Sequence, residues 1–256
     1  MDSIKLKPAW PKSKETIWNE RFAHLDEHNE KKAFVRRIPA WAYAAAAIVC
    51  AILLTGSFYT VTEQTAKGRH AIVYLPDRST VTLNAESMLS YKPCIWFITR
   101  NVRLEGEAYF EVKSGSRFCV LSGHNRTSVT GTTFNIYARP EVYRVTCLTG
   151  QVRVQSDGES VVLNPNMQAA VRERKISLDS NMTTLAATGW MQHKFDFVNT
   201  PLAEVIAEVE RQYDIEITAD YNPNLLYSGN FTKTANPEET LEIIGKAFGI
   251  FFTLGK

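Results

Sequence analysis

The stretch IPAWAYAAAAIVCAILLTGSFY (38–59) divides the chain into a short N-terminal part and a long C-terminal part. No charged residue occurs from Ile38 to Thr62. As a helix, these 22 residues would extend roughly 33 Å and cross a hydrocarbon core of about 30 Å. Aromatic residues at both ends resemble the belts found at membrane interfaces, namely Trp41, Tyr43, Phe58 and Tyr59. The pattern predicts one transmembrane helix, which begins too far along the chain to be a cleaved signal peptide.

The residues that flank this stretch predict its orientation. Four basic residues closely precede it, Lys31, Lys32, Arg36 and Arg37, whereas residues 60–66 carry none. Basic residues concentrate on the cytoplasmic side of membrane helices. We therefore expect residues 1–37 to form a cytoplasmic arm and residues 60–256 to lie on the other side of the membrane.

The arm contains one predicted amphipathic helix. Ser13 is a suitable N-cap, and an apolar stripe follows at i, i+4 and i+7, formed by Trp18, Phe22 and Leu25. A short isolated helix is marginally stable in water and gains stability when such a stripe packs on a partner. The stripe therefore predicts a protein contact in the cytoplasm. The alternative is that the stripe packs on the membrane surface or on nothing.

Composition and spacing argue against several classes of site. The net charge of +2 gives no basis for direct nucleic-acid binding. His24 and His28 are four residues apart but lack a third ligand, so we expect no zinc site and no cofactor. Three cysteines follow the apolar stretch, Cys94, Cys119 and Cys147, and none is in a CxxC motif. We expect them to be buried small hydrophobic residues, with a single disulfide as the alternative.

Residues 60–172 are predicted to form an all-β domain. Apolar and polar residues alternate in many short segments, as in VRLEGEAYFEV (102–112), and turns that contain glycine separate them. Glu105, Glu107 and Glu111 have the parity opposite to the apolar residues, so we expect them on the solvated face. No segment has the local motif of a nucleophile, and no catalytic residue is expected.

Residues 173–193 lose this alternation and are expected to form a linker. Over 194–256 the period changes and predicts two βαβ units. The first comprises FDFVN (195–199), a helix after Pro201 and IEITA (215–219), and the second comprises YSGNF (227–231), a helix from about residue 237 and FFTL (251–254). The predicted fold is therefore a single-pass membrane protein with an all-β domain followed by a small α+β domain.

Four consecutive blocks resemble the FecR family: LPDRSTVTLNAESMLSY (75–91), RNVRLEGEAYFEV (100–112), VTGTTFNIYA (129–138) and VTCLTGQVRV (145–154). In the family, and especially in its Bacteroidetes branch, the matching blocks read LPDGS-V-LN, R-V-L-GEAYFEV, GT-FNV and G-V-V. Arg78 and Asn166 stand at turn positions where the family usually has glycine. Both departures concern turns, and the strand pattern is intact.

The resemblance implies a function without catalysis. FecR-like proteins are inner-membrane regulators, anti-sigma factors that relay a signal through the periplasm. The signal passes from an outer-membrane TonB-dependent transporter to an extracytoplasmic-function sigma factor, which Trp18, Phe22 and Leu25 would contact. The arm of 37 residues is shorter than is usual in the family. The alternative is a membrane-tethered periplasmic binding or assembly module that contacts no sigma factor.

Residues 194–256 resemble the C-terminal domain of FecR-like proteins. They are also similar to the short N-terminal domains of secretins and TonB-dependent receptors, which share the pattern F-x-x-x-PL-x-x-V. Such domains pair with one another, and an exposed strand edge can accept a partner strand. Four residues are therefore candidate contacts with the transporter's signalling domain: Phe195, Phe197, Pro201 and Leu202. The alternative is that these residues build the core of their own domain.

The resemblance also implies that the signal crosses by proteolysis within the membrane. Thr55, Gly56 and Ser57 lie near the outer end of the predicted helix. Glycine lowers helix propensity by about 1 kcal/mol, and a protease must unwind a helix before it cleaves. These three residues are therefore the expected cleavage region. Small residues in membrane helices also serve helix packing, which is the alternative.

Overall fold

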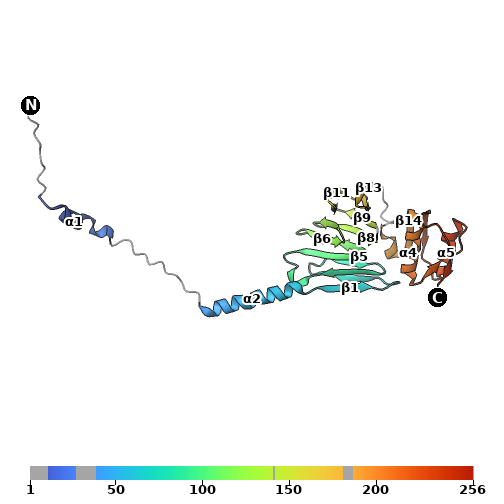
Figure 1. Ribbon diagram of the computed structural model, residues 1–256, viewed down its shortest axis with the longest axis horizontal. Helices are drawn as coiled ribbons and strands as arrows, with labels where there is room; N and C mark the ends of the chain where they lie inside the picture. The colour runs from blue at the N-terminus through green and yellow to red at the C-terminus, as the bar shows by residue number, and fades with distance from the viewer. Residues whose placement is uncertain (1–10, 27–38, 141, 181–186, 256) are drawn as a thin grey trace, which may run out of the picture. The chain divides into compact units, whose positions relative to one another are not determined.

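The computed structural model describes residues 11–26, 39–140, 142–180 and 187–255. These described residues divide into two units, one that ends at Cys50 and one that begins at Ala51. Figure 1 shows the order of the elements along the chain. The β-strands and the C-terminal helices all belong to the second unit.

In the described part of the chain, two helices precede the strands. Helix α1 covers Lys14–Asp26, and the hydroxyl of Ser13 accepts a hydrogen bond from the backbone N–H of Thr16 at 3.2 Å, which confirms the predicted N-cap. Helix α2 covers Ala40–Phe58. Among the described residues, no helix has both the length and the apolar character that a membrane crossing requires.

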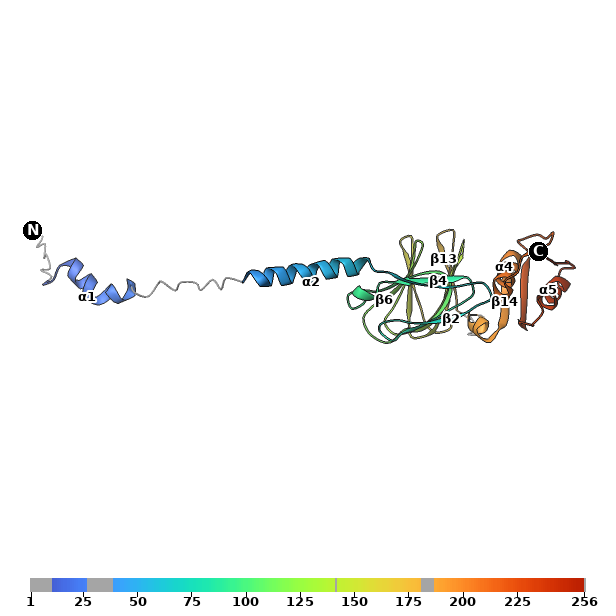
Figure 2. The ribbon, with the colours of Figure 1, turned by 90° about the horizontal axis from the view of Figure 1, so that it is seen from below.

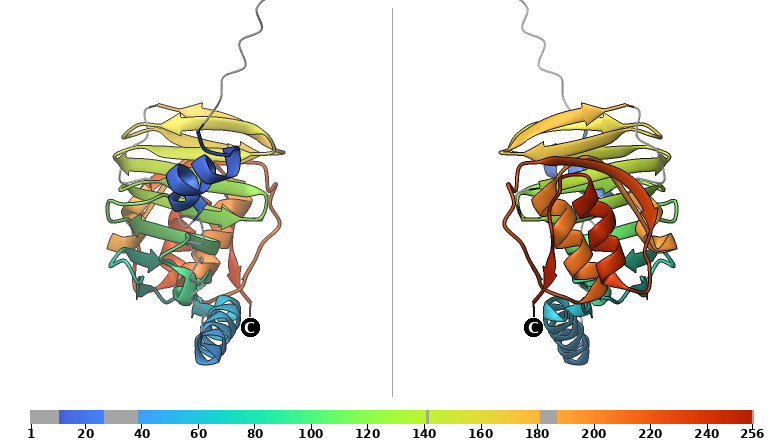
Figure 3. Two further views of the ribbon diagram at one scale, coloured as in Figure 1. Left: turned by 90° about the vertical axis from the view of Figure 1, so that its left-hand side faces the viewer. Right: turned by 90° about the vertical axis from the view of Figure 1, so that its right-hand side faces the viewer.

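Thirteen strands form the domain that follows, here called the β domain. They are β1 (Val61–Thr65), β2 (Ala71–Tyr74), β3 (Thr80–Leu83), β4 (Ser87–Tyr91), β5 (Arg100–Glu111), β6 (Phe118–Ser122), β7 (Asn125–Val129), β8 (Thr133–Arg139), β9 (Val142–Thr149), β10 (Val152–Ser156), β11 (Glu159–Leu163), β12 (Gln168–Arg172) and β13 (Lys175–Asp179). A short 3-10 helix, η1 (Pro93–Ile95), lies between β4 and β5. The predicted strands are confirmed, and Figure 3 shows them running side by side.

The strands form two layers that share β5. Its first half pairs with β4 and β6, and its second half pairs with β3 and β8. Gly106 lies between the halves with φ of +98°, where a Cβ would clash with Ser87 Oγ. Both the backbone conformation and the space there require glycine. Figure 2 shows the two layers edge-on. Apolar side chains fill the volume between them, including Leu83, Leu104, Phe110, Phe118 and Phe134.

Two predictions about this region are wrong. Strand β13 lies within residues 173–193, which the sequence analysis assigned to a linker. It is an edge strand whose side chains are mostly exposed, so its alternation carries little hydrophobic signal. Cys94 is exposed, because it belongs to η1 and not to a strand, whereas Cys119 and Cys147 are buried as predicted. Cys94, Cys119 and Cys147 are all free thiols.

The C-terminal domain, residues 187–255, contains the two predicted βαβ units. Its elements are η2 (Gly189–Gln192), β14 (Lys194–Pro201), α4 (Leu202–Tyr213), β15 (Ile217–Thr218), β16 (Leu226–Thr232), α5 (Pro237–Lys246) and β17 (Thr253–Leu254). The first strands of the two units pair antiparallel with each other, as β14 and β16, and so do the second strands, β15 and β17. The apolar faces of both helices meet in one core, to which Leu202, Val209, Leu241 and Ile244 contribute.

Candidate functional site

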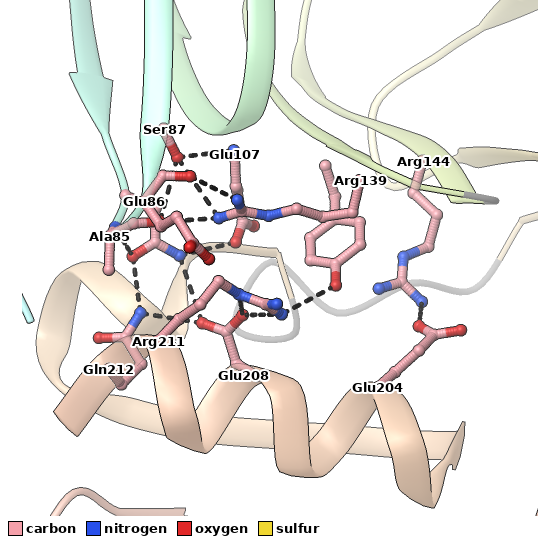
Figure 4. A network of polar contacts seen from close by, with 12 residues as sticks. Ala85, Glu86, Ser87, Glu107, Arg139, Arg144, Glu204, Glu208, Arg211 and Gln212 are labelled. Carbon is pink, nitrogen blue, oxygen red and sulfur yellow. Dashed lines mark hydrogen bonds and ion pairs between the residues drawn. The ribbon is translucent and has the colours of Figure 1, made fainter. Parts of the chain in front are cut away.

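Helix α4 has two different faces, and the polar one lies against the β domain. Its apolar residues, Leu202, Val205, Ile206 and Val209, are buried in the core of the C-terminal domain. Its polar residues Glu204, Glu208, Arg211 and Gln212 recur at intervals of about one helical turn on the other side. Figure 4 shows these four side chains projecting from α4 toward the strands. The helix therefore connects the two domains.

The β domain contributes a buried carboxyl group to this interface. Glu107 is 7 % exposed, and it accepts hydrogen bonds from the side-chain amides of Asn84 at 2.7 Å and Asn135 at 2.8 Å. The prediction of a solvated face is correct for Glu105 and Glu111 but wrong for Glu107. Glu107 has the same parity as the other two, but α4 covers the part of β5 on which it lies. The covering helix is about 100 residues away in sequence, so local alternation could not reveal it.

Direct hydrogen bonds cross the interface. Gln212 donates from Nε2 to Asn84 Oδ1 of the β domain at 2.7 Å, and it also donates to Glu208 Oε1 of its own helix at 2.9 Å. Arg211 donates from Nη2 to the hydroxyl of Tyr137 at 3.2 Å. The backbone also contributes, because the N–H of Gly68 donates to the carbonyl of Arg211 at 2.7 Å. These contacts join α4 to three separate segments of the β domain.

Ion pairs extend the interface along α4. Glu204 accepts from Arg144 Nη1 at 3.1 Å and from Arg172 Nη2 at 2.6 Å. The guanidinium of Arg144 also lies over the ring of Tyr137, 4.3 Å from its centroid. On the helix itself, Glu208 pairs with Arg211 at 2.9 Å. Charged and amide groups therefore predominate among the contacts that hold the two domains together.

The electrostatics of the site centre on Glu107. Burial, and to a smaller extent the nearby carboxylate of Glu208, raises the pKa of Glu107 to about 7. The amides of Asn84 and Asn135 and the charge of Arg139 oppose the shift. Burial also lowers the pKa of His70, which lies within hydrogen-bond distance of Gln212 at 3.3 Å. The protonation states of Glu107 and His70 therefore affect the contacts at this interface.

A polar cavity of about 310 Å³ adjoins the interface. Its lining includes Glu107, Asn135, Tyr137 and Glu204. The Oδ1 atom of Asn135 is buried and has no hydrogen-bond partner among the described residues. Within the described residues, no group of three or more acidic, histidine or cysteine side chains is arranged to hold a metal ion. The arrangement fits a docking interface between domains.

The residues predicted to contact a sigma factor lie on α1. Trp18 is 56 % exposed and Phe22 is 38 % exposed, and their ring centroids are 5.0 Å apart. Leu25 belongs to the same helix, but its side chain lies outside the described set. Trp18 and Phe22 therefore form an exposed aromatic pair.

The residues predicted to contact the transporter lie mainly inside the C-terminal domain. Phe195, Phe197 and Leu202 are buried in its core, and Pro201 is half-buried at the junction of β14 and α4. Their position agrees with the alternative that they build the core. A partner that approaches this part of the domain would instead meet Val198 and Leu226, which are exposed on β14 and β16.

The predicted cleavage region, Thr55, Gly56 and Ser57, forms the end of α2. Gly56 lies against the β domain, because a Cβ placed on it would be 3.3 Å from Cys94 Cβ. The side chains of Thr55 and Ser57 lie outside the described set.

The sequence analysis did not identify the interface residues. The signal that could have found them is the polar face of residues 202–213, where Glu204, Glu208 and Arg211 share one side of an amphipathic helix. Alone, that pattern equally predicts a solvated surface. The β-domain partners, such as Asn84 and Asn135, come from different strands and share no local motif.

Both domains match models of known protein families. Residues 61–153 match the family model described as FecR protein, and residues 194–256 match the model described as FecR, C-terminal. No match is found among curated proteins.

Two crystal structures from Parabacteroides distasonis ATCC 8503, described as candidate anti-sigma factors, are similar to this chain. One, at 2.50 Å resolution, has a TM-score of 0.72 and 29 % sequence identity, covering 77 % of this chain and 99 % of its own. The other, at 1.65 Å resolution, has a TM-score of 0.70 and 27 % identity, covering 77 % of this chain and 100 % of its own.

These matches support a regulatory role that involves a sigma factor, within a class of proteins that are not enzymes. The two family models match successive parts of the sequence, and each solved structure covers 77 % of this chain. The chain belongs to the FecR family.

Proposed function

We propose that this protein is an anti-sigma regulator that spans the bacterial inner membrane once. Its N-terminal arm binds an extracytoplasmic-function sigma factor in the cytoplasm, and its β and C-terminal domains receive the signal in the periplasm. The observation that carries this proposal is the joint match of both domains to the FecR family and to structures described as candidate anti-sigma factors.

The arm supplies the sigma-factor contact. Trp18 and Phe22 are exposed next to each other on a capped helix, although both are large aromatic residues that gain from burial. Aromatic anchors of this kind often dominate the binding energy of an interface. A sigma factor that covers them would also stabilise a helix too short to be stable alone.

The membrane crossing is supported by the sequence of residues 38–59. The stretch is uncharged, basic residues precede it and aromatic residues lie at both ends. A reporter enzyme that is active only in the periplasm, fused after Lys256, tests the orientation. Activity of the fusion supports a cytoplasmic N-terminus, and activity of a cytoplasm-specific reporter at the same position contradicts it.

The C-terminal domain receives the signal from the signalling domain of an outer-membrane TonB-dependent transporter. The support for this step is the family of residues 194–256 and the exposed apolar side chains of Val198 and Leu226 on its paired strands. Because α4 also forms the interface with the β domain, a partner bound to the C-terminal domain would alter the contacts of Glu204, Glu208 and Gln212.

Cleavage near Thr55 and Ser57 then releases the arm into the cytoplasm. Replacing both residues with leucine should strengthen the helix and slow the appearance of the cytoplasmic fragment. Gly56 is left unchanged in this variant because a larger residue there would press on Cys94. An unchanged rate of fragment formation on immunoblots argues against cleavage at this position.

Capture of sigma factors by the full chain tests the whole proposal. Trp18→Ala should weaken capture roughly thirtyfold, equivalent to about 2 kcal/mol, because it removes a large anchor. The matched control is Asn19→Ala, which removes an exposed polar side chain from the same helix. If the wild type captures no sigma factor, the chain acts instead as a tethered periplasmic module. If Trp18→Ala captures the sigma factor as the wild type does, Trp18 is not the anchor of this contact.

A further inference from the structure

The loop between β4 and β5, residues 92–99, exposes two large apolar side chains. Phe97 is 77 % exposed and Ile98 is 69 % exposed. Single exposed apolar residues are common on protein surfaces, but two consecutive ones at a loop tip form a protruding apolar surface.

The structure holds this tip in a defined conformation. Trp96 is buried and packs edge-on against Tyr91 at 5.7 Å and against Phe118 at 6.0 Å between ring centroids. The backbone N–H groups of Ile98 and Thr99 both donate to the carbonyl of Ile95, at 2.9 and 3.0 Å. Because Trp96 anchors the loop, its two neighbours are presented outward by the fold itself.

The tip lies where the apolar stretch enters the β domain. Val61, at the start of β1, pairs with Tyr91 at the end of β4, so the chain enters the sheet beside the point where this loop leaves it. A Cβ on Gly56 would be 3.3 Å from Cys94 Cβ, which places the end of α2 against the same loop. Phe58 and Tyr59, which follow that contact, are themselves exposed.

Two exposed basic residues lie near the base of the loop. Lys92 begins the loop and is exposed. Arg117 is also exposed and directly precedes Phe118, against which Trp96 packs. Basic side chains beside exposed aromatic residues are typical of protein surfaces that bind anionic lipid headgroups.

We infer that the loop 92–99 inserts into the lipid surface, with Phe97 and Ile98 among the acyl chains and Lys92 and Arg117 at the headgroups. This inference rests on the proposed membrane crossing, because residues 38–59 would bring the loop to the bilayer. Apolar side chains of interfacial segments reach about 5–10 Å into the boundary between headgroups and acyl chains. The contact would hold the β domain against the membrane at a fixed height.

Quenching by brominated lipids tests this contact directly. The full chain, with Cys50→Ala and Cys94→Ala, is labelled with a fluorophore at Ile98→Cys and reconstituted into vesicles. The vesicles contain phosphatidylethanolamine and phosphatidylglycerol, with or without phosphatidylcholine brominated on its acyl chains. The matched control carries the label at Val198→Cys, which is 61 % exposed on β14 of the C-terminal domain.

We expect the label at position 98 to lose roughly half of its emission with brominated lipid and the label at position 198 to keep its emission, since bromine quenches only at contact depth. Flotation of the same vesicles tests the membrane crossing separately. A chain that floats but shows no quenching at position 98 overturns the lipid contact and leaves the crossing intact. If iodide in solution does not quench the label and brominated lipid does not quench it either, protein covers the loop. That result also overturns the lipid contact. A chain that does not float overturns both.

Discussion

Gln212 of the C-terminal domain donates a hydrogen bond to Asn84 of the β domain, with 2.7 Å between Nε2 and Oδ1. Both side chains are buried, and 128 residues separate them in the chain. The same Asn84 donates to Glu107, so a single amide links the helix of one domain to the buried carboxyl group of the other. The interface is therefore specified by directional polar contacts.

Replacing Gln212 should destabilise this interface. Gln212→Ala leaves the Oδ1 atom of Asn84 with one fewer donor, and we expect a loss of about 1–3 kcal/mol in the free energy of unfolding. The control is Gln155→Ala, which removes an exposed side chain on β10 and should cost less than about 0.5 kcal/mol. Denaturant unfolding of the two variants measures the difference. Equal losses would mean that the Gln212 contact contributes nothing specific.

Glu107 should make stability depend on pH. Its pKa is raised to about 7 in the folded protein from 4.5, so the folded state holds a proton that the unfolded state releases. Because the folded state then binds more protons, stability should fall as pH rises from about 4.5 to 7 and level off above that range. The expected loss from this group is about 1–3 kcal/mol.

Glu107→Gln isolates that contribution. Glutamine cannot ionise, and Asn135 can turn its amide so that its unpartnered Oδ1 accepts from the new side chain. The variant should be more stable than the wild type above about pH 7 and should lose most of the pH dependence. Parallel stability curves for both proteins across this range would show that Glu107 does not titrate there.

The arrangement of strands was largely predictable from sequence, and the domain interface was not. Alternation at positions such as Val102 and Leu104 reports burial between the layers, which is a local property of a strand. For Glu107, alternation within the strand does not predict burial. Its burial depends on α4, which packs on the outer face of the sheet, and no local pattern in the strand encodes that contact.

The candidate contact residues show the same limit. The spacing of Phe195, Phe197 and Leu202 correctly indicated an apolar cluster, but spacing cannot distinguish a core from a partner surface. The exposure of residues such as Phe97 and Val198 produces no hydrophobic periodicity in the sequence. Their exposure becomes visible when the packing of their neighbours is known.

Gly106 and Gly158 provide a matched test of the bend in β5. Both have positive φ, +98° and +91°, so alanine is strained at either position. They differ in space, because a Cβ on Gly106 would lie 2.7 Å from Ser87 Cα, whereas nothing lies within 4 Å at Gly158. Gly158→Ala should cost about 1 kcal/mol and Gly106→Ala about 2–4 kcal/mol, since the backbone of Ser87 must move. Similar losses in denaturant unfolding would show that the sheet adapts easily at this point.

Reversing the charge of Glu204 should weaken domain docking in a way that salt reveals. Glu204→Arg places a third guanidinium beside Arg144 and Arg172, replacing two attractive contacts with repulsion. We expect a loss of about 1–2 kcal/mol in the free energy of unfolding at low salt, and the loss should shrink in high salt because ions screen partly exposed charges.

A second substitution tests whether the effect comes from the pair. Arg144→Glu in the Glu204→Arg background restores one attractive pair, but it removes the contact of Arg144 with the Tyr137 ring and leaves Arg172 facing the new arginine. Rescue should therefore be partial, recovering roughly half of the loss. The matched control is Glu242→Arg on α5, where the partner Lys246 is 73 % exposed and the loss should be much smaller than that of Glu204→Arg. If Glu242→Arg costs as much as Glu204→Arg, or if the deficit is insensitive to salt, the ion pairs of Glu204 do not hold the domains together.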